Sequence, residues 1–270
     1  MGHPETPGSQ RDRCYAYRHS LDLLGVGTEL DGRRRCAAER VMNLKEVLRW
    51  LERRGTRRHR IGLARYGITT ARAFGVPVGT LQALRKRIGR DQQLSLDLWR
   101  SGWLEARLLA ALVGDPQQVT RRQMDAWARS FENWATCDAA CFHLFDKTAH
   151  AWAKVVQWAK AKREFEKRGA FALLASLALH DKGAADAVFT ALLPVVEREA
   201  GDERNFVKKA VSWALRGIGK RNRELHAAAT AVARRLAASA EAPRRWVGKD
   251  ALRDLGRAQV KARLAKKPVS

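Results

Sequence analysis

The sequence predicts an all-α fold in which helices are stacked as a solenoid, and three observations lead to that prediction. From Met42 onward, apolar residues recur at the spacing of amphipathic helices, as at Val47, Leu48 and Leu51. No segment shows the convincing alternation of polar and apolar residues that marks a strand. Short segments rich in Gly, Pro and Asp separate the helical stretches, and paired helices with short loops are typical of α-solenoids.

The helical stretches follow one another along the body of the chain. They are expected at 44–55, 58–66, 79–89, 92–101, 103–113, 120–129, 133–146, 149–160, 164–180, 184–199, 204–219 and 222–238. Breakers at 75–77, 114–116, 180–183 and 201–202 end several of them. Near the C-terminus, Trp246, Val247, Leu252 and Leu255 can anchor a short capping helix, and Lys261–Lys267 is expected to be a solvated basic tail.

Three parts of the chain differ in composition. Residues 1–41, with Pro4, Pro7 and Arg33–Arg35, are expected to be a mostly disordered leader. One hypothesis is that Met42 is the natural start of the protein. Residues 42–264 are expected to form the helical repeat domain, and residues 265–270 a basic tail.

Three of the expected helices resemble one another. The segments 105–112, 166–173 and 207–214 each place a basic residue (Arg107, Arg168 and Lys209) before a strip of small and apolar residues. Arg168 and Lys209 are 41 residues apart, which is a two-helix period of HEAT-like repeats. The sequence therefore predicts a right-handed α-solenoid of HEAT-like repeats with a concave basic face, although basic residues that begin solvated helix faces give the same pattern.

The charge of the chain points to a polyanionic partner. The 270 residues include 52 Lys and Arg against 28 Asp and Glu, a formal net charge of +24. Nucleic acid is the leading candidate, and an anionic membrane surface is the rival. No apolar run is long enough to span a membrane and no secretory signal is visible, so we expect a cytoplasmic protein.

The four cysteines do not form a disulfide framework, and no metal site is expected. Cys137 and Cys141 are one helical turn apart, and they are expected to be buried thiols. A metal ion would need two further ligands nearby, and His143 alone does not complete the set.

The segment 131–145 holds the most informative candidate for chemistry. Asn133 is a plausible N-cap, and Trp134, Asp138 and Cys141 follow at helical spacing on one face. A carboxylate beside an indole on an apolar helix is costly to bury without a purpose. The alternative is an Asp that favours the helix dipole and bonds a neighbouring loop.

Two further candidates each have a structural alternative. Trp213 is flanked by Lys209 and Arg216, an arrangement suited to a DNA backbone, but it is equally compatible with a core position. Arg168 opens the apolar stretch 169–179 and is suited either to clamping a phosphate or to an ion pair at a repeat junction.

In its motifs the chain resembles the AlkD-type DNA alkylation repair enzymes, which are alkylpurine DNA glycosylases built of HEAT-like repeats. The resemblance covers roughly residues 44–264 and depends on the order and spacing of several motifs. These are Arg65-Tyr66, Phe74-Gly75-Val76, Leu98-Trp99-Arg100-Ser101, Glu105-Ala106-Arg107, Asn133-Trp134 with Cys137-Asp138, Lys167-Arg168-Gly169-Ala170-Phe171, Lys208-Lys209-Ala210 and Ser212-Trp213-Ala214-Leu215-Arg216.

The resemblance implies roles for individual residues. The catalytic group would be Asp138 with Trp134 and Trp213. Among the DNA-binding residues, the resemblance implies Arg168 and Tyr66. The basic residues Lys167, Lys208, Lys209, Arg216 and Arg107 are also expected to bind DNA. Pro77, after Gly75-Val76, departs from the polar residue of some members, which leaves the substrate preference open.

The chemistry implied by the resemblance is hydrolysis of the N-glycosidic bond of cationic N3- or N7-alkylated purines in double-stranded DNA. Such a base is already charged and leaves without a strong acid, so Asp138 would stabilise the oxocarbenium-like sugar and position water. The resemblance also implies that the lesion is not flipped into a closed pocket. We expect a monomer that needs no cofactor.

Three other classes remain as alternatives. A non-catalytic α-solenoid that binds nucleic acid or protein would keep the basic face but have no use for Asp138. A helix-hairpin-helix glycosylase is disfavoured because its only hairpin-like segment, 23–27, lies in the leader. A lyase with a Schiff-base lysine stays open, because no single Lys stands out.

Overall fold

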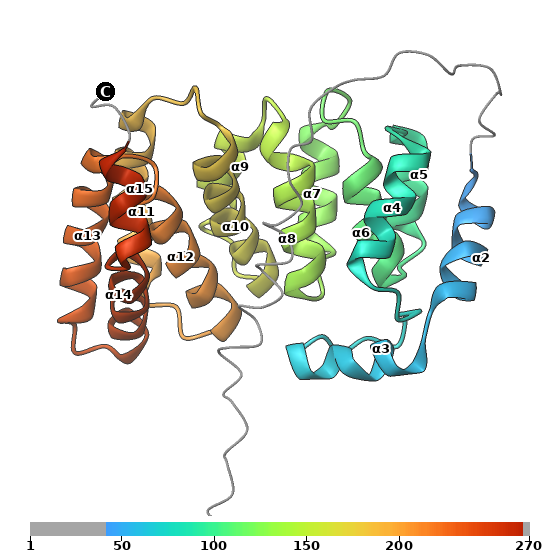
Figure 1. Ribbon diagram of the computed structural model, residues 1–270, viewed down its shortest axis with the longest axis horizontal. Helices are drawn as coiled ribbons and strands as arrows, with labels where there is room; N and C mark the ends of the chain where they lie inside the picture. Colours follow the sequence, from blue (N-terminus) through green and yellow to red (C-terminus); the bar gives the residue numbers. More distant parts are fainter. Residues whose placement is uncertain (1–41, 267–270) are drawn as a thin grey trace, which may run out of the picture.

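The structure is a computed structural model that describes residues 42–266, and within this part of the chain every regular element is a helix (Figure 1). The α-helices are α2 (Leu44–Arg54), α3 (Arg57–Gly62), α4 (Val78–Ile88), α5 (Gln92–Arg100), α6 (Leu104–Val113), α7 (Arg121–Arg129), α8 (Trp134–His143), α9 (Ala151–Trp158), α10 (Glu164–His180), α11 (Asp186–Glu199), α12 (Asn205–Ile218), α13 (Arg223–Ala237), α14 (Ala242–Leu255) and α15 (Ala258–Ala265). Two 3₁₀-helices, η1 (Leu63–Tyr66) and η2 (Phe145–Lys147), complete the set.

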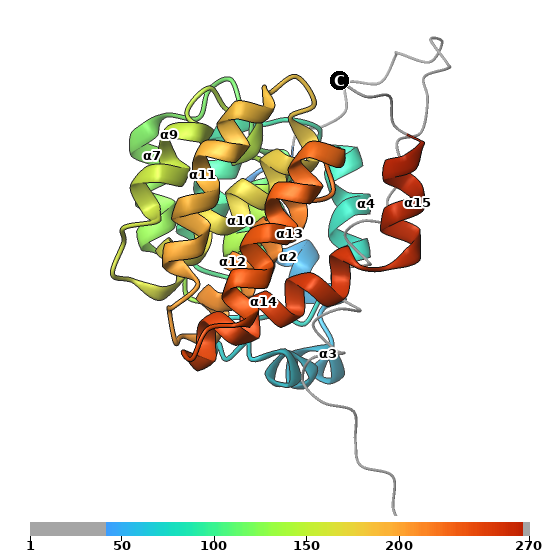
Figure 2. The same cartoon turned by 90° about the vertical axis from the view of Figure 1, so that its left-hand side faces the viewer.

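The helices are arranged as an α-solenoid, as predicted. The even-numbered helices α4 to α14 pack one against the next in chain order. Behind them, α5, α9, α11 and α13 pack on α6, α10, α12 and α14 respectively. Figure 1 shows the pairs following one another along the long axis, and Figure 2 shows the stack from its C-terminal end.

The centre of the stack is α10, which is buried on nearly all sides. Its residues Arg168 to Ala178 are all buried, and it packs against α8, α9 and α12. A helix that is apolar all round is typical of such a central position. A charged side chain at the start of this run therefore has to find its partners inside the protein.

Three regularly spaced arginines join neighbouring repeats through hydrogen bonds to backbone carbonyl groups. The Nη1 atoms of Arg163 and Arg204 donate to the carbonyl oxygens of Arg129 and Lys162, at 3.2 and 2.6 Å. Arg244 does the same to Glu197, at 3.1 Å. The three donors are spaced by 41 and 40 residues in the sequence. Arg163 and Arg244 satisfy carbonyls in the last turns of α7 and α11, where cations are favoured, and Arg204 satisfies a carbonyl in the loop between α9 and α10.

Local sequence explains where α8 begins and where η1 ends. The Asn133 side chain accepts a hydrogen bond from the Thr136 backbone N–H at 3.1 Å, so the predicted N-cap of α8 is confirmed. The predicted helix at 58–66 is instead split into α3 and η1. Gly67 ends η1 with φ of 70°, in the left-handed region that favours glycine.

The predicted solvated tail at Lys261–Lys267 is helical over most of its length, although Lys261, Arg263 and Lys266 are exposed. Residues 258–265 form α15, and Val260 and Leu264 bury their side chains one turn apart. Residues 267–270 and the predicted leader at 1–41 lie outside the described residues. No helix between residues 42 and 266 is long and apolar enough to cross a membrane.

Candidate functional site

Asp138 on α8 and Arg168 on α10 form a buried, two-pronged ion pair. Arg168 Nε donates to Asp138 Oδ1 at 2.8 Å, and Nη2 donates to Oδ2 at 2.6 Å. The two residues are only 3% and 2% exposed. This parallel geometry fixes the orientation of the carboxylate and is the strongest form of a carboxylate–guanidinium contact.

The pair is anchored to a third helix. Arg168 Nη1 donates to the carbonyl oxygen of Phe206 on α12, at 2.7 Å. Burial opposes the charge of Arg168, but the charge and hydrogen bonds of Asp138 outweigh it and raise the pKa of the guanidinium. Arg168 therefore forms an ion pair at a repeat junction, which is one of the two roles that the sequence predicted for it.

Trp134 is one turn before Asp138 on α8, as the sequence predicted, and its indole is fixed by the N-terminal part of the chain. Trp134 Nε1 donates to the carbonyl oxygen of Tyr66 at 2.8 Å, and Trp134 is 5% exposed. Tyr66, which was identified by its side chain, thus reaches the site through its backbone. The contact joins η1 to α8 across 68 residues of sequence.

An open pocket of about 610 Å³ lies beside Trp134. Its walls come from α3, η1, the start of α4, α6 and α8, and they include Arg58, Ile61, Arg65, Tyr66 and Trp134. A second cavity of only about 20 Å³ is lined by Trp134, Ala135 and Asp138 among others. Trp134 and Ala135 line both spaces. Asp138 therefore lines the small cavity but not the 610 Å³ pocket, and the two spaces share Trp134 and Ala135.

Sequence reasoning missed the residue that shapes this pocket, Glu105. Its carboxylate is 2% exposed and accepts hydrogen bonds from the backbone N–H groups of Phe74, Gly75 and Val76, at 2.9, 2.6 and 3.1 Å. Gly75 has φ of 83°. The Glu105 anion holds this loop against α6, where the loop lines the pocket. The available signal was a Glu in the first turn of a helix whose one other charged residue is Arg107.

Trp213 lies on α12 and is half-buried against the core. It follows Phe206 by seven residues, so the two occupy the same face of α12, about 10 Å apart along the axis. Phe206 supplies the carbonyl that accepts from Arg168. The structure thus connects Trp213 to the Asp138–Arg168 pair through α12. Lys209, also half-buried, lies on the same helix.

Two predicted DNA-binding cations, Arg216 and Lys167, are engaged within the protein. Arg216 is 7% exposed, donates to the carbonyl of Ser212 at 3.2 Å and lies 3.7 Å from carboxylates of α14. Lys167 Nζ contacts Glu199 at 2.7 Å and Asp202 at 3.4 Å. The sequence does not reveal these partners, because it does not show which acids the repeats bring to each cation.

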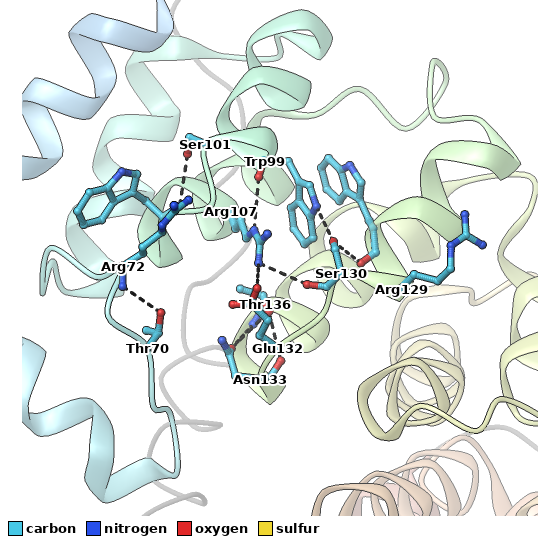
Figure 3. A network of polar contacts seen from close by, with 12 residues as sticks. Thr70, Arg72, Trp99, Ser101, Arg107, Arg129, Ser130, Glu132, Asn133 and Thr136 are labelled. Carbon is cyan, nitrogen blue, oxygen red and sulfur yellow. Dashed lines mark hydrogen bonds and ion pairs between the residues drawn. The ribbon is translucent and has the colours of Figure 1, made fainter.

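Arg107 is likewise part of a network, shown in Figure 3. Its Nε and Nη1 donate to the carbonyl oxygens of Trp99 and Ser130, at 3.4 and 3.3 Å, and its guanidinium lies 5.3 Å from the Trp99 ring. Trp99 itself stacks on Trp127. Lys208 is less enclosed, with its Nζ 5.5 Å from the ring of Trp246. Arg107 therefore joins neighbouring repeats, as Arg168 does.

The cysteines of α8 are buried, as expected. Cys137 and Cys141 direct their sulfur atoms toward the carbonyl oxygens of Phe165 and Gly169, each at 3.5 Å. Burial raises the pKa of the Cys141 thiol, with a further contribution from Cys137. Among residues 42–266, no three His, Cys, Asp or Glu side chains gather into a potential metal site.

Comparison with known proteins places these features in context. A family model described as "DNA alkylation repair enzyme" matches residues 47–255. A solved structure from "a new family of proteins related to the HEAT-like repeat DNA glycosylases with affinity for branched DNA structures" superposes with a TM-score of 0.65 at 20% identity, covering 72% of this chain and 83% of that chain. A designed armadillo repeat protein bound to a (KR)₄ peptide gives a TM-score of only 0.35 at 14% identity, covering 70% and 80%. No curated protein matches the sequence.

Proposed function

We propose that this chain, which belongs to the DNA alkylation repair enzyme family, is a monofunctional DNA glycosylase for cationic N3- and N7-alkylated purines. The observation that carries the proposal is the buried Asp138 carboxylate, held in a two-pronged ion pair one turn from Trp134. Its substrate is double-stranded DNA, on which we propose that it acts as a monomer in the cytoplasm, at the nucleoid. No cofactor is needed for this chemistry.

The proposed reaction begins with the charge on the damaged base. An N3- or N7-alkylated purine carries a positive charge, so its glycosidic bond breaks with the electron pair going to the base and without prior protonation. The deoxyribose is left with oxocarbenium character at C1′. The Asp138 carboxylate stabilises that positive charge and orients a water molecule for attack at C1′. The attacking water forms the new C1′–O bond and releases one proton to solvent, so that the neutral free base and an abasic site are the products.

Arg168 is a positioning residue in this proposal. A buried carboxylate without a partner would take up a proton and lose its charge. The two hydrogen bonds from Arg168 compensate the buried charge of the Asp138 carboxylate and fix the direction of its oxygens. The indole faces of Trp134 and Trp213 add cation–π attraction for the sugar, at about 0.5–2 kcal/mol each.

Access to Asp138 requires movement on DNA binding. The carboxylate is 3% exposed and lines the small cavity but not the 610 Å³ pocket, and the indole of Trp134 is held by the Tyr66 carbonyl. We therefore propose that binding displaces η1 and Trp134 enough to present the carboxylate to the sugar. The lesion need not be flipped into a closed pocket in this scheme.

A second candidate function is non-catalytic recognition of DNA. Two observations favour it: Asp138 is fully engaged by Arg168, and the related structure with a TM-score of 0.65 is from a family described by its affinity for branched DNA. In that case the Asp138–Arg168 pair would serve only to join α8 to α10.

Substitution of Asp138 separates the two functions. We expect wild-type protein to release 7-methylguanine from methylated duplex DNA, and Asp138→Asn to reduce the single-turnover rate by about 100-fold or more. Because Asp138→Asn leaves Arg168 buried without its partner, it is also expected to destabilise the fold by about 3–5 kcal/mol.

The double variant Asp138→Asn/Arg168→Gln is the matched control. It removes both charges, so it is expected to regain much of the lost stability while its excision rate stays low. An excision rate equal to that of wild type in the folded double variant would remove Asp138 from the mechanism. No release by wild-type protein would favour the non-catalytic function.

A further inference from the structure

The cations without partners in the structure are concentrated near the N-terminal end of the described chain. Residues 53–90 contain 11 Lys and Arg and no Asp or Glu. Arg57, Arg58, Arg60 and Arg65, on α3 and η1, are all exposed. None of the ion pairs within residues 42–266 includes any of these four. This contrasts with Arg163, Arg204 and Arg244, which bond the neighbouring repeats.

An apolar side chain sits among these arginines. Ile61 is 59% exposed, more than any other large hydrophobic residue in the described part of the chain. Leaving such a side chain in water is unfavourable, and its burial against a ligand would favour binding. A single exposed Ile is common on protein surfaces, but this one is surrounded by exposed cations.

The location of Ile61 ties it to the candidate site. Ile61, Arg58 and Arg65 line the same 610 Å³ pocket as Tyr66 and Trp134. Figure 1 shows α3 crossing beneath the ends of the stacked helices, outside the two rows, and Figure 2 shows it again at that edge. A ligand that reaches Trp134 through the pocket therefore passes the tip of α3.

We propose that α3 and η1 form a DNA-contacting arm in which Ile61 is an apolar wedge for the minor groove and the four arginines hold the flanking phosphates. An apolar residue inserted at a base step, next to cations on the backbone, is a general way for proteins to kink or unstack a duplex. A site that has lost stacking, beside a damaged base, is the step where insertion is least costly. The inference rests on the proposed function only in taking duplex DNA as the ligand.

An anionic membrane surface is negatively charged, as DNA is, but it matches the side chains of the arm less well. Binding at a membrane surface scales with the apolar area that is buried, and amphipathic helices achieve it with a full apolar face. Here α3 has six residues, four of them Arg or His, and one exposed apolar side chain. The arm matches a groove between two strands of phosphates better than a lipid surface.

The test compares Ile61→Ser with Val188→Ser, whose parent side chain is 40% exposed on α11, away from the pocket. The probe is a duplex with a tetrahydrofuran abasic analogue and a neighbouring 2-aminopurine, read by fluorescence and by anisotropy. Wild type and Val188→Ser are expected to raise the 2-aminopurine signal. Ile61→Ser is expected to abolish that rise and to weaken binding to this duplex about 10-fold, while binding to undamaged duplex stays within about twofold.

The arginines are tested by salt dependence. Arg58→Gln/Arg65→Gln is expected to weaken binding to both duplexes and to reduce the slope of log K against log salt by about 2, since each phosphate contact contributes roughly 0.9. Ile61→Ser is expected to leave this slope unchanged. The wedge proposal is overturned if Ile61→Ser keeps the fluorescence rise and the affinity, or if Val188→Ser loses both equally.

Two further outcomes are informative. Loss of binding to phosphatidylserine vesicles in Ile61→Ser, with DNA binding intact, would overturn the proposal in favour of a membrane. These measurements need no base release. If wild type releases no alkylated base but its 2-aminopurine signal depends on Ile61, the glycosylase proposal fails and the wedge stands.

Discussion

At the scale of single residues, the structure shows how the buried charge of the Asp138 carboxylate is compensated. A carboxylate that is 3% exposed has lost nearly all its hydration, and only a compensating charge and hydrogen bonds make that tolerable. Arg168 supplies both to Asp138. Sequence analysis singled out both residues but gave them separate tasks, because the 30 residues between them hide the contact that α8 and α10 create.

His143, at the end of α8, gives a prediction about pH. Burial lowers the pKa of His143 from an ordinary 6.5 to about 4, and the nearby Lys147 contributes in the same direction. As the pH falls, the unfolded chain therefore binds this proton before the folded chain does. The contribution of neutral His143 to stability is complete above pH 6.5 and is lost as the pH falls toward 4.

Urea unfolding of wild type and His143→Gln measures this effect. Between pH 7 and pH 5, wild type is expected to lose about 2 kcal/mol more of its unfolding free energy than the variant loses. Comparing the two proteins cancels the titration of shared carboxylates. Equal losses in the two proteins would show that His143 is protonated as easily in the folded state as in the unfolded chain.

At the scale of elements, close packing between helices gives a second prediction. A methyl group on Gly248 of α14 would lie 2.2 Å from the backbone nitrogen of Ala237 and 2.6 Å from the carbonyl oxygen of Ala233. Gly248→Ala is therefore expected to destabilise the protein by about 3 kcal/mol or more, because backbone atoms of α13 would have to move.

Gly79 on α4 is the matched control for this substitution. A methyl group there meets nothing within 4 Å, so Gly79→Ala is expected to be neutral or to stabilise by up to about 1 kcal/mol. Thermal unfolding of the two variants checks the pair. Similar melting temperatures for both would contradict the close approach of α13 and α14.

The elements were largely predictable because their signals are local. Apolar spacing and the Asn133 cap located α8, and the breaker at 180–183 lies between α10 and α11. The errors arose where local signals conflict with packing. Val260 and Leu264 form a narrow apolar stripe in a basic segment, which is a helix only because α15 packs it against the stack.

At the scale of the whole molecule, the net charge predicted a basic protein but not where its open cations are. Arg107, Arg163, Arg168, Arg204, Arg216 and Arg244 all bond the protein itself. The segment 53–90, which has no acidic residue, holds exposed arginines instead. Pairing depends on which acids the fold brings close, and composition carries no information about that.

The spacing of the candidate site residues was predictable from the sequence, but their partners were not. The Trp134–Asp138 spacing follows from the helical repeat and is confirmed. The roles of Phe206 and of the Tyr66 backbone were not predictable, because they act through carbonyl groups that every residue has. Glu105 was hidden because its partners are the N–H groups of a loop about 30 residues earlier.

The central claim is that the molecule removes purines that are already cationic, and one measurement tests it most directly. Duplexes carrying a single 7-methylguanine, 3-methyladenine, hypoxanthine or uracil are incubated with excess wild-type protein, and the released base is quantified. We expect release of the two methylated purines and no release of hypoxanthine or uracil above the spontaneous rate, since the proposed mechanism uses Asp138 to stabilise the sugar and includes no acid to protonate a neutral base. Release of the neutral bases at comparable rates, or of none of the four, would contradict the account.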